Sequence, residues 1–193
     1  MNTSFYLPEE LEKLGLGSYG ENVLISRRAS LYGAENMHFG SNVRIDDFCV
    51  LSGKIKLGSY VHISAAVLMY GGSAGITFED FTTISSRGAV YALSDDYSGE
   101  HMTNPMIPEK YSGVTQAPVY VEKHCIIGTG STILPGVRLG EGCSFGAMCL
   151  INKSTEAWGI YMGIPLRRTG ERSRRLLEDC EKLLAETAEE SLE

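Results

Sequence analysis

The residues best suited to acid–base chemistry lie in one long interruption of the chain's pattern, the stretch ALSDDYSGEHMTNPMIPEKYSG from Ala92 to Gly113. It carries two adjacent carboxylates, Asp95 and Asp96, and a histidine, His101. A histidine or carboxylate can act as a general base, and neighbouring carboxylates raise one another's pKa toward neutrality. We therefore take these three residues as candidate catalytic groups. The alternative is that the two aspartates only cap a turn.

The elements on either side of this interruption follow a six-residue period, which differs from the period of a helix. Each unit reads apolar, small or acidic, any, any, small or apolar, any. Twelve units in two blocks share this pattern, more than chance would produce. The units are FGSNVR, IDDFCV, LSGKIK, LGSYVH, ISAAVL, FEDFTT, ISSRGA, VEKHCI, IGTGST, ILPGVR, LGEGCS and FGAMCL.

A repeating hexamer of this kind builds a short strand and a sharp turn, and three hexamers close one triangular coil. Stacked coils bury the aliphatic residues and pair the backbones of successive turns. The period therefore predicts a parallel β-helix over 20–166, in a mostly β single domain of residues 1–193, with an extended loop at about 92–118. We expect a helical cap at 5–16, where a proline opens and a glycine ends LPEELEKLG. Three- to four-residue apolar spacing predicts an amphipathic helix at 170–187.

The position of each cysteine and histidine in the hexamer limits its chemistry. Four cysteines take the fifth, inward position, so we interpret them as packing residues rather than nucleophiles. Three histidines take turn positions, where a solvent- or interface-facing role is expected. The chain contains no CxxC pair and no Cys/His cluster, so we expect no metal. The cysteines are Cys49, Cys125, Cys143 and Cys149, and the histidines are His38, His62 and His124.

With these motifs the chain resembles the hexapeptide-repeat, left-handed β-helix acyltransferases, and most closely the sugar O- or N-acetyltransferases of surface-polysaccharide gene sets, a group similar to the galactoside, maltose and xenobiotic acetyltransferases. The resemblance runs from about Phe5 to Arg172. It is carried by VRIDDFCVLSGKI, SDDYSGEHMTNP, HCIIGTGSTILPGV and WGIYMGIP. It implies a homotrimer with active sites between subunits and transfer of acetyl from acetyl-coenzyme A to a sugar hydroxyl or amine, with the acceptor free or linked to a nucleotide or lipid.

The resemblance also implies a histidine base at the loop entry, and here the sequence departs from the family. Asp95 stands where the xenobiotic acetyltransferases have their histidine. Three alternatives remain open at this stage: His101 enters the site from another loop position, the Asp95/Asp96 pair takes the proton, or His62 of a neighbouring subunit does so.

The same resemblance suggests where the acceptor binds. Asp46 matches the position of a sugar-contacting asparagine in the galactoside acetyltransferases, with Asp47 beside it and His62 as a further candidate. Asp46 therefore becomes a candidate ligand for a sugar hydroxyl or ammonium. A simpler interpretation is that its carboxylate accepts hydrogen bonds from turn amides.

The coenzyme A motifs of the family match more closely. Small residues permit close backbone approach of a pantetheine arm, and cations attract its phosphates. The expected cofactor-binding residues are Gly128, Thr129, Gly146, Ala147, Lys153 and Arg168.

Composition narrows the remaining function classes. A net charge of −7 is unfavourable for nonspecific nucleic-acid binding. No apolar run is long enough to span a membrane, and the N-terminus lacks the features of a signal peptide, so we expect a cytoplasmic location. Two rival functions share the predicted fold: a γ-class carbonic anhydrase, which needs three histidines around zinc, and a noncatalytic scaffold.

Overall fold

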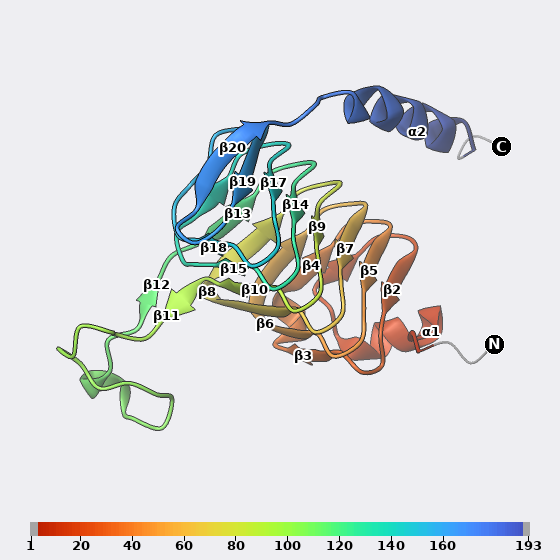
Figure 1. The fold of residues 1–193 in the computed structure, drawn as a ribbon. Coiled ribbons are helices and arrows are strands. Elements are labelled where there is room, and N and C mark those ends of the chain that lie inside the picture. Colours follow the sequence, from red (N-terminus) through yellow and green to blue (C-terminus); the bar gives the residue numbers. More distant parts are fainter. Residues whose placement is uncertain (1–3, 191–193) are drawn as a thin grey trace.

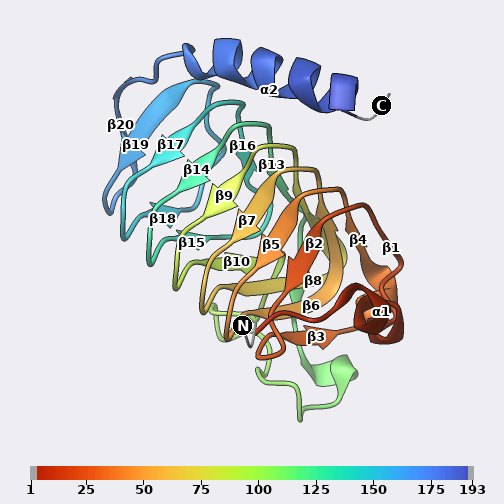
Figure 2. The same cartoon turned by 90° about the vertical axis from the view of Figure 1, so that its right-hand side faces the viewer.

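The structure is a computed structural model that describes residues 4–190, with side chains described up to residue 188. Its main body is a three-sided solenoid of short strands, with a long loop projecting from one corner and a helix lying along one side (Figures 1 and 2). The helices are α1 (Pro8–Leu11), η1 (Glu12–Leu14), η2 (Ala34–Asn36), η3 (Glu109–Tyr111) and α2 (Leu176–Glu190). The strands are β1 (Ser18–Tyr19), β2 (Val23–Ile25), β3 (Ser30–Tyr32), β4 (Met37–Phe39), β5 (Val43–Ile45), β6 (Val50–Leu57), β7 (Val61–Ile63), β8 (Leu68–Phe78), β9 (Thr83–Ile84), β10 (Ala89–Tyr91), β11 (Leu93–Ser94), β12 (Thr115–Gln116), β13 (Val119–Val121), β14 (Ile126–Ile127), β15 (Thr132–Ile133), β16 (Arg138–Leu139), β17 (Ser144–Phe145), β18 (Leu150–Ile151), β19 (Gly159–Met162) and β20 (Arg167–Glu171).

The strands stack in parallel along each side of the solenoid. One side consists of β2, β5, β7, β9, β14, β17 and β19 in that order, which corresponds to about seven turns. The other two sides form one ten-stranded sheet, because β6 and β8 bend through the corner between them. This arrangement confirms the left-handed parallel β-helix that the six-residue period predicts. The first side is called face 1, the side with β10, β15 and β18 face 2, and the side with β4, β13 and β16 face 3.

Aliphatic residues fill the interior in columns, one residue per turn. The pairing register places Ile25, Ile45, Ile63, Ile84 and Ile127 directly above one another on face 1, and all five are fully buried. Burying an isoleucine side chain stabilises a fold by about 1.5–3 kcal/mol before entropy is counted. The repeated column therefore provides much of the driving force for stacking the turns.

The four inward cysteines are also part of this interior. Cys49, Cys125, Cys143 and Cys149 are all buried, at most 2 % exposed. Burial raises the pKa of the Cys49 thiol to about 11. All four thiols are therefore part of the packed interior, as their inward positions predicted.

The corners need residues in the left-handed backbone conformation. After face 1 the chain turns through Phe48, Ala66, Arg87, Gly130 and Met148, all with φ between 57° and 70°. Before face 1 it turns through a second set, which includes Tyr60, Phe81, His124 and Trp158. Their rings stack along the corner, with centroids 4.8 Å apart for Tyr60–Phe81 and 5.1 Å for Phe81–His124. Stacking offsets part of the backbone cost of a non-glycine residue at positive φ.

The extended loop leaves the solenoid where faces 2 and 3 meet. Strands β11 and β12 pair antiparallel at its base, and the segment between them projects away from the body as the green arm of Figure 1. Gln116 on β12 accepts hydrogen bonds from both the N–H (2.9 Å) and the hydroxyl (2.6 Å) of Ser73, which ties the loop base to β8.

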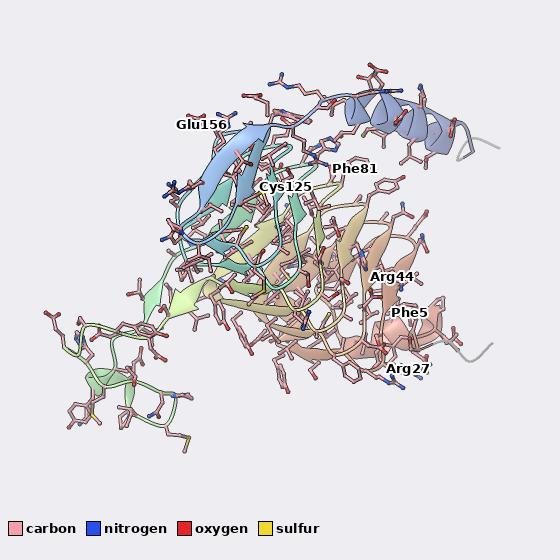
Figure 3. All side chains as sticks on the ribbon, viewed as in Figure 1. Phe5, Arg27, Arg44, Phe81, Cys125 and Glu156 are labelled. Carbon is pink, nitrogen blue, oxygen red and sulfur yellow. The ribbon has the colours of Figure 1, made fainter. Side chains whose placement is uncertain are left out.

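The C-terminal part differs from the sequence expectation of a helix at 170–187. Gly163 adopts φ 82°, and the chain reverses there so that β20 pairs antiparallel with β19. The helix α2 begins only at Leu176. Leu176, Cys180 and Leu183 line a cleft with Phe81 and His124, so the apolar side of α2 faces the aromatic corner, with Leu183 still 40% exposed. Figure 3 shows Phe81 on the side of the solenoid that faces α2.

At the N-terminal end, α1 and η1 provide the helical cap. Leu11 is buried, and Arg27 pairs with Glu10 across the end of the first turn. None of the helices in the described part of the chain has both the length and the apolar character of a membrane span.

Candidate active site

The corner after face 1 carries a row of small and polar residues, one from each turn. Asp46, Ser64, Ser85, Gly128 and Gly146 each follow the buried core residue of their strand, and each backbone N–H donates to the turn above. A Cβ atom on Gly128 would lie 2.5 Å from the backbone carbon of Gly146. Glycine is therefore required at Gly128 for two turns to approach this closely, and the row stays free of bulky side chains there.

Asp46 and His62 meet at the N-terminal part of this row. The Nε2 atom of His62 lies 2.8 Å from one carboxylate oxygen of Asp46, and Arg44 Nε donates to the other at 2.7 Å. Partial burial opposes ionisation of Asp46, but the hydrogen bonds from His62 and Arg44 outweigh it and lower the pKa of the carboxyl. Asp46 is therefore ionised at neutral pH. Figure 3 shows Arg44 near Phe5, and its guanidinium carbon lies 5.2 Å from the Phe5 ring centroid.

Asp47, the neighbouring candidate, has different partners. Its carboxylate accepts hydrogen bonds from the Ser26 hydroxyl and, at 3.0 Å, from the Arg28 guanidinium. Both carboxylate oxygens therefore serve contacts within the first turns. The structure brings Asp46 and His62 together and directs Asp47 toward a different set of groups.

The loop residues separate in the same way. Asp96 accepts the backbone N–H groups of Ser98 and His101, both at 2.7 Å. Its hydrogen bonds to Ser98 and His101 lower the pKa of Asp96 to about 2. This is the opposite of the increase that a carboxylate pair would produce. The ring of His101 lies 3.5 Å from Asp96, and its side chain is 52 % exposed.

Asp95 lies instead at a cavity of about 680 Å³ where the loop joins the solenoid. Within the described residues its carboxylate has no hydrogen-bond partner, and only its backbone oxygen accepts a bond, from the Ser94 hydroxyl. The loop therefore offers one carboxylate that is committed to a turn, Asp96, and one that is available to a ligand, Asp95.

The cavity walls are mostly aromatic and apolar, as is usual for small-molecule sites. Tyr70 on β8 and Tyr91 on β10 stack with ring centroids 5.4 Å apart. Neither tyrosine was among the site residues predicted from the sequence. The available signal was their position at the two interruptions of the period: Tyr70 directly precedes the two glycines within β8, and Tyr91 ends β10 beside the loop. The cavity is lined by Tyr70, Tyr91, Leu93, Ser94, Asp95, Tyr97, Leu134 and Pro135.

The residues expected to hold coenzyme A lie partly along one corner. Gly128, Thr129, Gly146 and Ala147 come from two adjacent turns, and the Thr129 hydroxyl donates to the Ser86 carbonyl at 2.6 Å. Gly128 and Gly146 carry no side chain, so the backbone of this corner would permit the close approach of a thin pantetheine chain.

The two expected cations lie away from this corner, Lys153 after β18 at the far end of face 2 and Arg168 on β20, and they differ in their availability. Lys153 is exposed and forms no ion pair within the described residues. Arg168 is engaged by Glu156 at 2.9 Å and Glu171 at 2.6 Å. Lys153 is therefore the cation that could meet a phosphate without losing a partner.

The histidines that a zinc enzyme of this fold would need are on different parts of the turn. His38 is on face 3 beside Ser18, His62 is on face 1 with Asp46, and His124 is in the aromatic corner. In the part of the chain that the structure describes, no three His, Cys, Asp or Glu side chains gather as they would around a metal ion.

Comparison with known proteins places this geometry among sugar acyltransferases. The profile of the family described as "Bacterial transferase hexapeptide (six repeats)" matches residues 118–153. The chain is 43% identical over 177 residues to a dTDP-4-amino-4,6-dideoxy-D-glucose acyltransferase of Escherichia coli, which covers 90% of this chain and 92% of that protein.

Solved structures give the same relationship. AntD, an N-acyltransferase from Bacillus cereus in complex with dTDP-4-amino-4,6-dideoxyglucose and coenzyme A, superposes with a TM-score of 0.94 at 46% identity, over 96% of this chain and 100% of that one. AntD has also been solved with dTDP and 3-hydroxybutyryl-CoA. A galactoside acetyltransferase shares the fold, with a TM-score of 0.62 at 16% identity over 89% of this chain and 76% of that one.

Proposed function

The chain belongs to the bacterial hexapeptide-repeat transferase family, and on that premise we propose that it is a coenzyme A-dependent N-acyltransferase acting on the amino group of a nucleotide-linked amino sugar. The observation that carries the proposal is Asp95, an unpartnered carboxylate at the aromatic cavity where the loop joins the solenoid. The names of the relatives support an amino rather than a hydroxyl acceptor.

In this reaction the thioester supplies an activated acyl group, and the protein positions the amine and takes its proton. The neutral amine attacks the thioester carbonyl carbon, the carbon–sulfur bond breaks, and the sulfur leaves as the thiolate. Asp95 accepts the proton that the nitrogen loses, which is the role of a general base. Asp96 holds the loop turn that presents Asp95, because both of its oxygens accept backbone N–H groups.

The acceptor and the donor are held by different corners. The corner row that contains Ser85 and Gly128 and the loop entry that contains Asp95 are separated by β10, and a strand of three residues spans about 10 Å. One chain therefore presents its two groups of candidate residues at opposite ends of face 2. We propose that a homotrimer brings the loop of one subunit to the corner row of the next.

Within that arrangement the Asp46–His62 pair has a place beside the acceptor. Asp46 lies three turns before Gly128 in the same row, on the side away from the small residues expected to hold coenzyme A. An ionised carboxylate there attracts a sugar ammonium or accepts a bond from a sugar hydroxyl. We place the reaction in the cytoplasm, where nucleotide-linked sugars and acyl-coenzyme A are made.

The proposal is tested by thiol release from acetyl-coenzyme A and 3-hydroxybutyryl-coenzyme A with three acceptors: dTDP-4-amino-4,6-dideoxyglucose, the corresponding 4-hydroxy compound, and the free amino sugar. We expect turnover with the nucleotide-linked amine to exceed the other two by at least about a hundredfold, because the nucleotide adds binding energy and the hydroxyl is the weaker nucleophile. Equal rates with the hydroxyl acceptor would contradict N-acyl transfer. The absence of thiol release with every amine would contradict the function as a whole.

A further inference from the structure

A second groove lies on face 3, around the corner from the aromatic cavity. It has a volume of about 300 Å³, at the lower limit of small-molecule sites. It runs between the outward faces of β4 and β6 and the bulged part of β8. No carboxylate lines it. The lining residues are Asn36, His38, Lys54, Ile55, Lys56, Ala74, Gly75, Ile76 and Thr77.

Two lysines give this groove its charge. Lys54 and Lys56 flank the buried Ile55 on β6, so both side chains project from the same outer side of the strand. Neither forms an ion pair within the described residues, although the chain as a whole has 24 acidic and only 17 basic residues. Two adjacent ammonium groups without a counter-ion repel one another, and a bound anion would relieve that repulsion.

The side chains beside the two lysines can donate hydrogen bonds, and none of them is a carboxylate. The pairing register places His38 on β4 and Thr77 on β8 directly beside Lys56. The Nδ1 atom of His38 is 2.9 Å from the Ser18 hydroxyl, which orients the ring. Glu35 accepts a hydrogen bond from Asn36 at 3.2 Å but does not line the groove.

The floor of the groove is small and connected to the loop. Ala74 and Gly75 form part of it, and Gly75 adopts φ 94° in the bulge of β8. The residue before them, Ser73, is the one that Gln116 holds at the loop base. A ligand in this groove would therefore contact the bulge that supports the loop, and the loop also carries Asp95.

From these features we infer that the groove binds the diphosphate of the nucleotide-linked acceptor, an inference that rests on the proposed function. Lysines bind phosphates as point charges, and two of them match the charge of a diphosphate. Coenzyme A also carries phosphates, but the small residues expected to hold it, Gly128 to Ala147, lie on later turns at the corner after face 1, and Lys153 follows β18 on the last turns. The groove lies on the early turns, beside the base of the acceptor loop.

The test is calorimetric titration of the intact protein with dTDP, coenzyme A and inorganic pyrophosphate. Three variants are compared: Lys54→Gln together with Lys56→Gln, Lys13→Gln as a control for charge at an exposed lysine outside the groove, and Lys153→Gln on the coenzyme A side. We expect the double variant to weaken dTDP binding at least tenfold and to leave coenzyme A binding within twofold. Lys153→Gln should do the reverse, and Lys13→Gln should change neither. Pyrophosphate should compete with dTDP in the wild type only.

The salt dependence gives a second readout. Binding of dTDP to the wild type should weaken as salt rises, because ammonium–phosphate attraction is screened, and the double variant should lose most of this dependence. A dTDP affinity within twofold of wild type in the double variant would overturn the inference. Loss of coenzyme A binding instead of dTDP binding would overturn the assignment to the acceptor. Wild-type protein that binds dTDP but transfers no acyl group would contradict the proposed function and leave the groove in place.

Discussion

Replacing Gly128 with alanine tests how tightly the turns are stacked at the proposed donor corner. The new Cβ would lie 2.5 Å from the backbone carbon of Gly146 and 2.6 Å from the Ala147 nitrogen. These atoms cannot retreat easily, because Gly146 N–H donates to the Tyr161 carbonyl at 2.9 Å and Gly128 N–H donates to the Phe145 carbonyl at 2.9 Å. The clash therefore involves backbone on both sides.

Two effects of opposite sign set the magnitude. Overpacking of this kind costs about 1–3 kcal/mol. Alanine also restricts the unfolded chain relative to glycine, which stabilises the fold by about 0.4–1 kcal/mol where the backbone is permissive, and Gly128 does not have a positive φ. Steric strain is the larger effect, so Gly128→Ala should lower the free energy of unfolding by about 1–2 kcal/mol.

Two matched glycines separate the steric effect from the change of residue type. A Cβ on Gly146 would meet the flexible Met162 side chain at 3.3 Å and the Tyr161 carbonyl oxygen at an ordinary 3.8 Å, and one on Gly170 would make ordinary contact with Ile160 at 3.7 Å. Gly146→Ala should therefore be mildly destabilising, and Gly170→Ala neutral or slightly stabilising. Urea unfolding at a fixed protein concentration, followed by the fluorescence of Trp158, the single tryptophan, gives the comparison. Equal midpoints for Gly128→Ala and Gly170→Ala would refute the close approach of these turns.

Three further predictions follow from the pKa shifts and the cavity. Asp96 has a folded pKa of about 2, so its contribution to loop order should be complete above about pH 4 and lost as the pH falls toward 2. Proteolysis of the loop should therefore accelerate as the pH falls from about 4 to about 2. Asp96→Asn should accelerate proteolysis of the loop at pH 7 as well. Burial lowers the pKa of His124, so the unfolded state takes up a proton at higher pH than the folded state, and the free energy of unfolding should fall as the pH drops below about 6.5. His124→Phe, which keeps the ring stack, should reduce this fall. Urea titrations at pH 7 and pH 5.5 give the comparison. Tyr91→Leu removes the stack with Tyr70 and should raise the KM for the nucleotide-linked acceptor about tenfold while changing the KM for acyl-coenzyme A less than twofold; an equal rise in both would contradict an acceptor cavity.

Much of the fold was predictable because the six-residue period encodes it directly. Each turn repeats one inward aliphatic residue, so Ile45, Ile63 and Ile84 identify their column from sequence alone. The start of the C-terminal helix was not predictable in this way. Residues 167–171, RRTGE, contain no apolar residue and carry no helical spacing, and pairing with the exposed edge of β19 satisfies their backbone as a strand.

The candidate site was predictable in residue types and only partly in roles. The loop and Asp95 could be predicted because the six-residue period is interrupted there. The glycine corner could be predicted because the second position of each hexamer is small or acidic. The different environments of Asp95 and Asp96 could not be predicted, because residues in a loop follow no period. Which of the two carboxylates accepts hydrogen bonds depends on the backbone amide groups near it in the folded loop. Tyr70 and Tyr91 were missed because outward positions of a solenoid carry no period of their own, and only the stacking of two turns brings them together.

The role of Asp95 as proton acceptor is tested by measuring the kcat/KM of Asp95→Asn for dTDP-4-amino-4,6-dideoxyglucose. His101→Ala is measured beside it. The dTDP affinity and the thermal midpoint of each variant serve as controls. We expect Asp95→Asn to lose at least about a hundredfold in kcat/KM, the scale of general-base catalysis, with both controls unchanged. His101→Ala should stay within about threefold of wild type, because its ring lies on the exposed part of the loop beside Asp96. Near-wild-type turnover of Asp95→Asn, or a hundredfold loss for His101→Ala instead, would contradict the assignment of Asp95 as the general base.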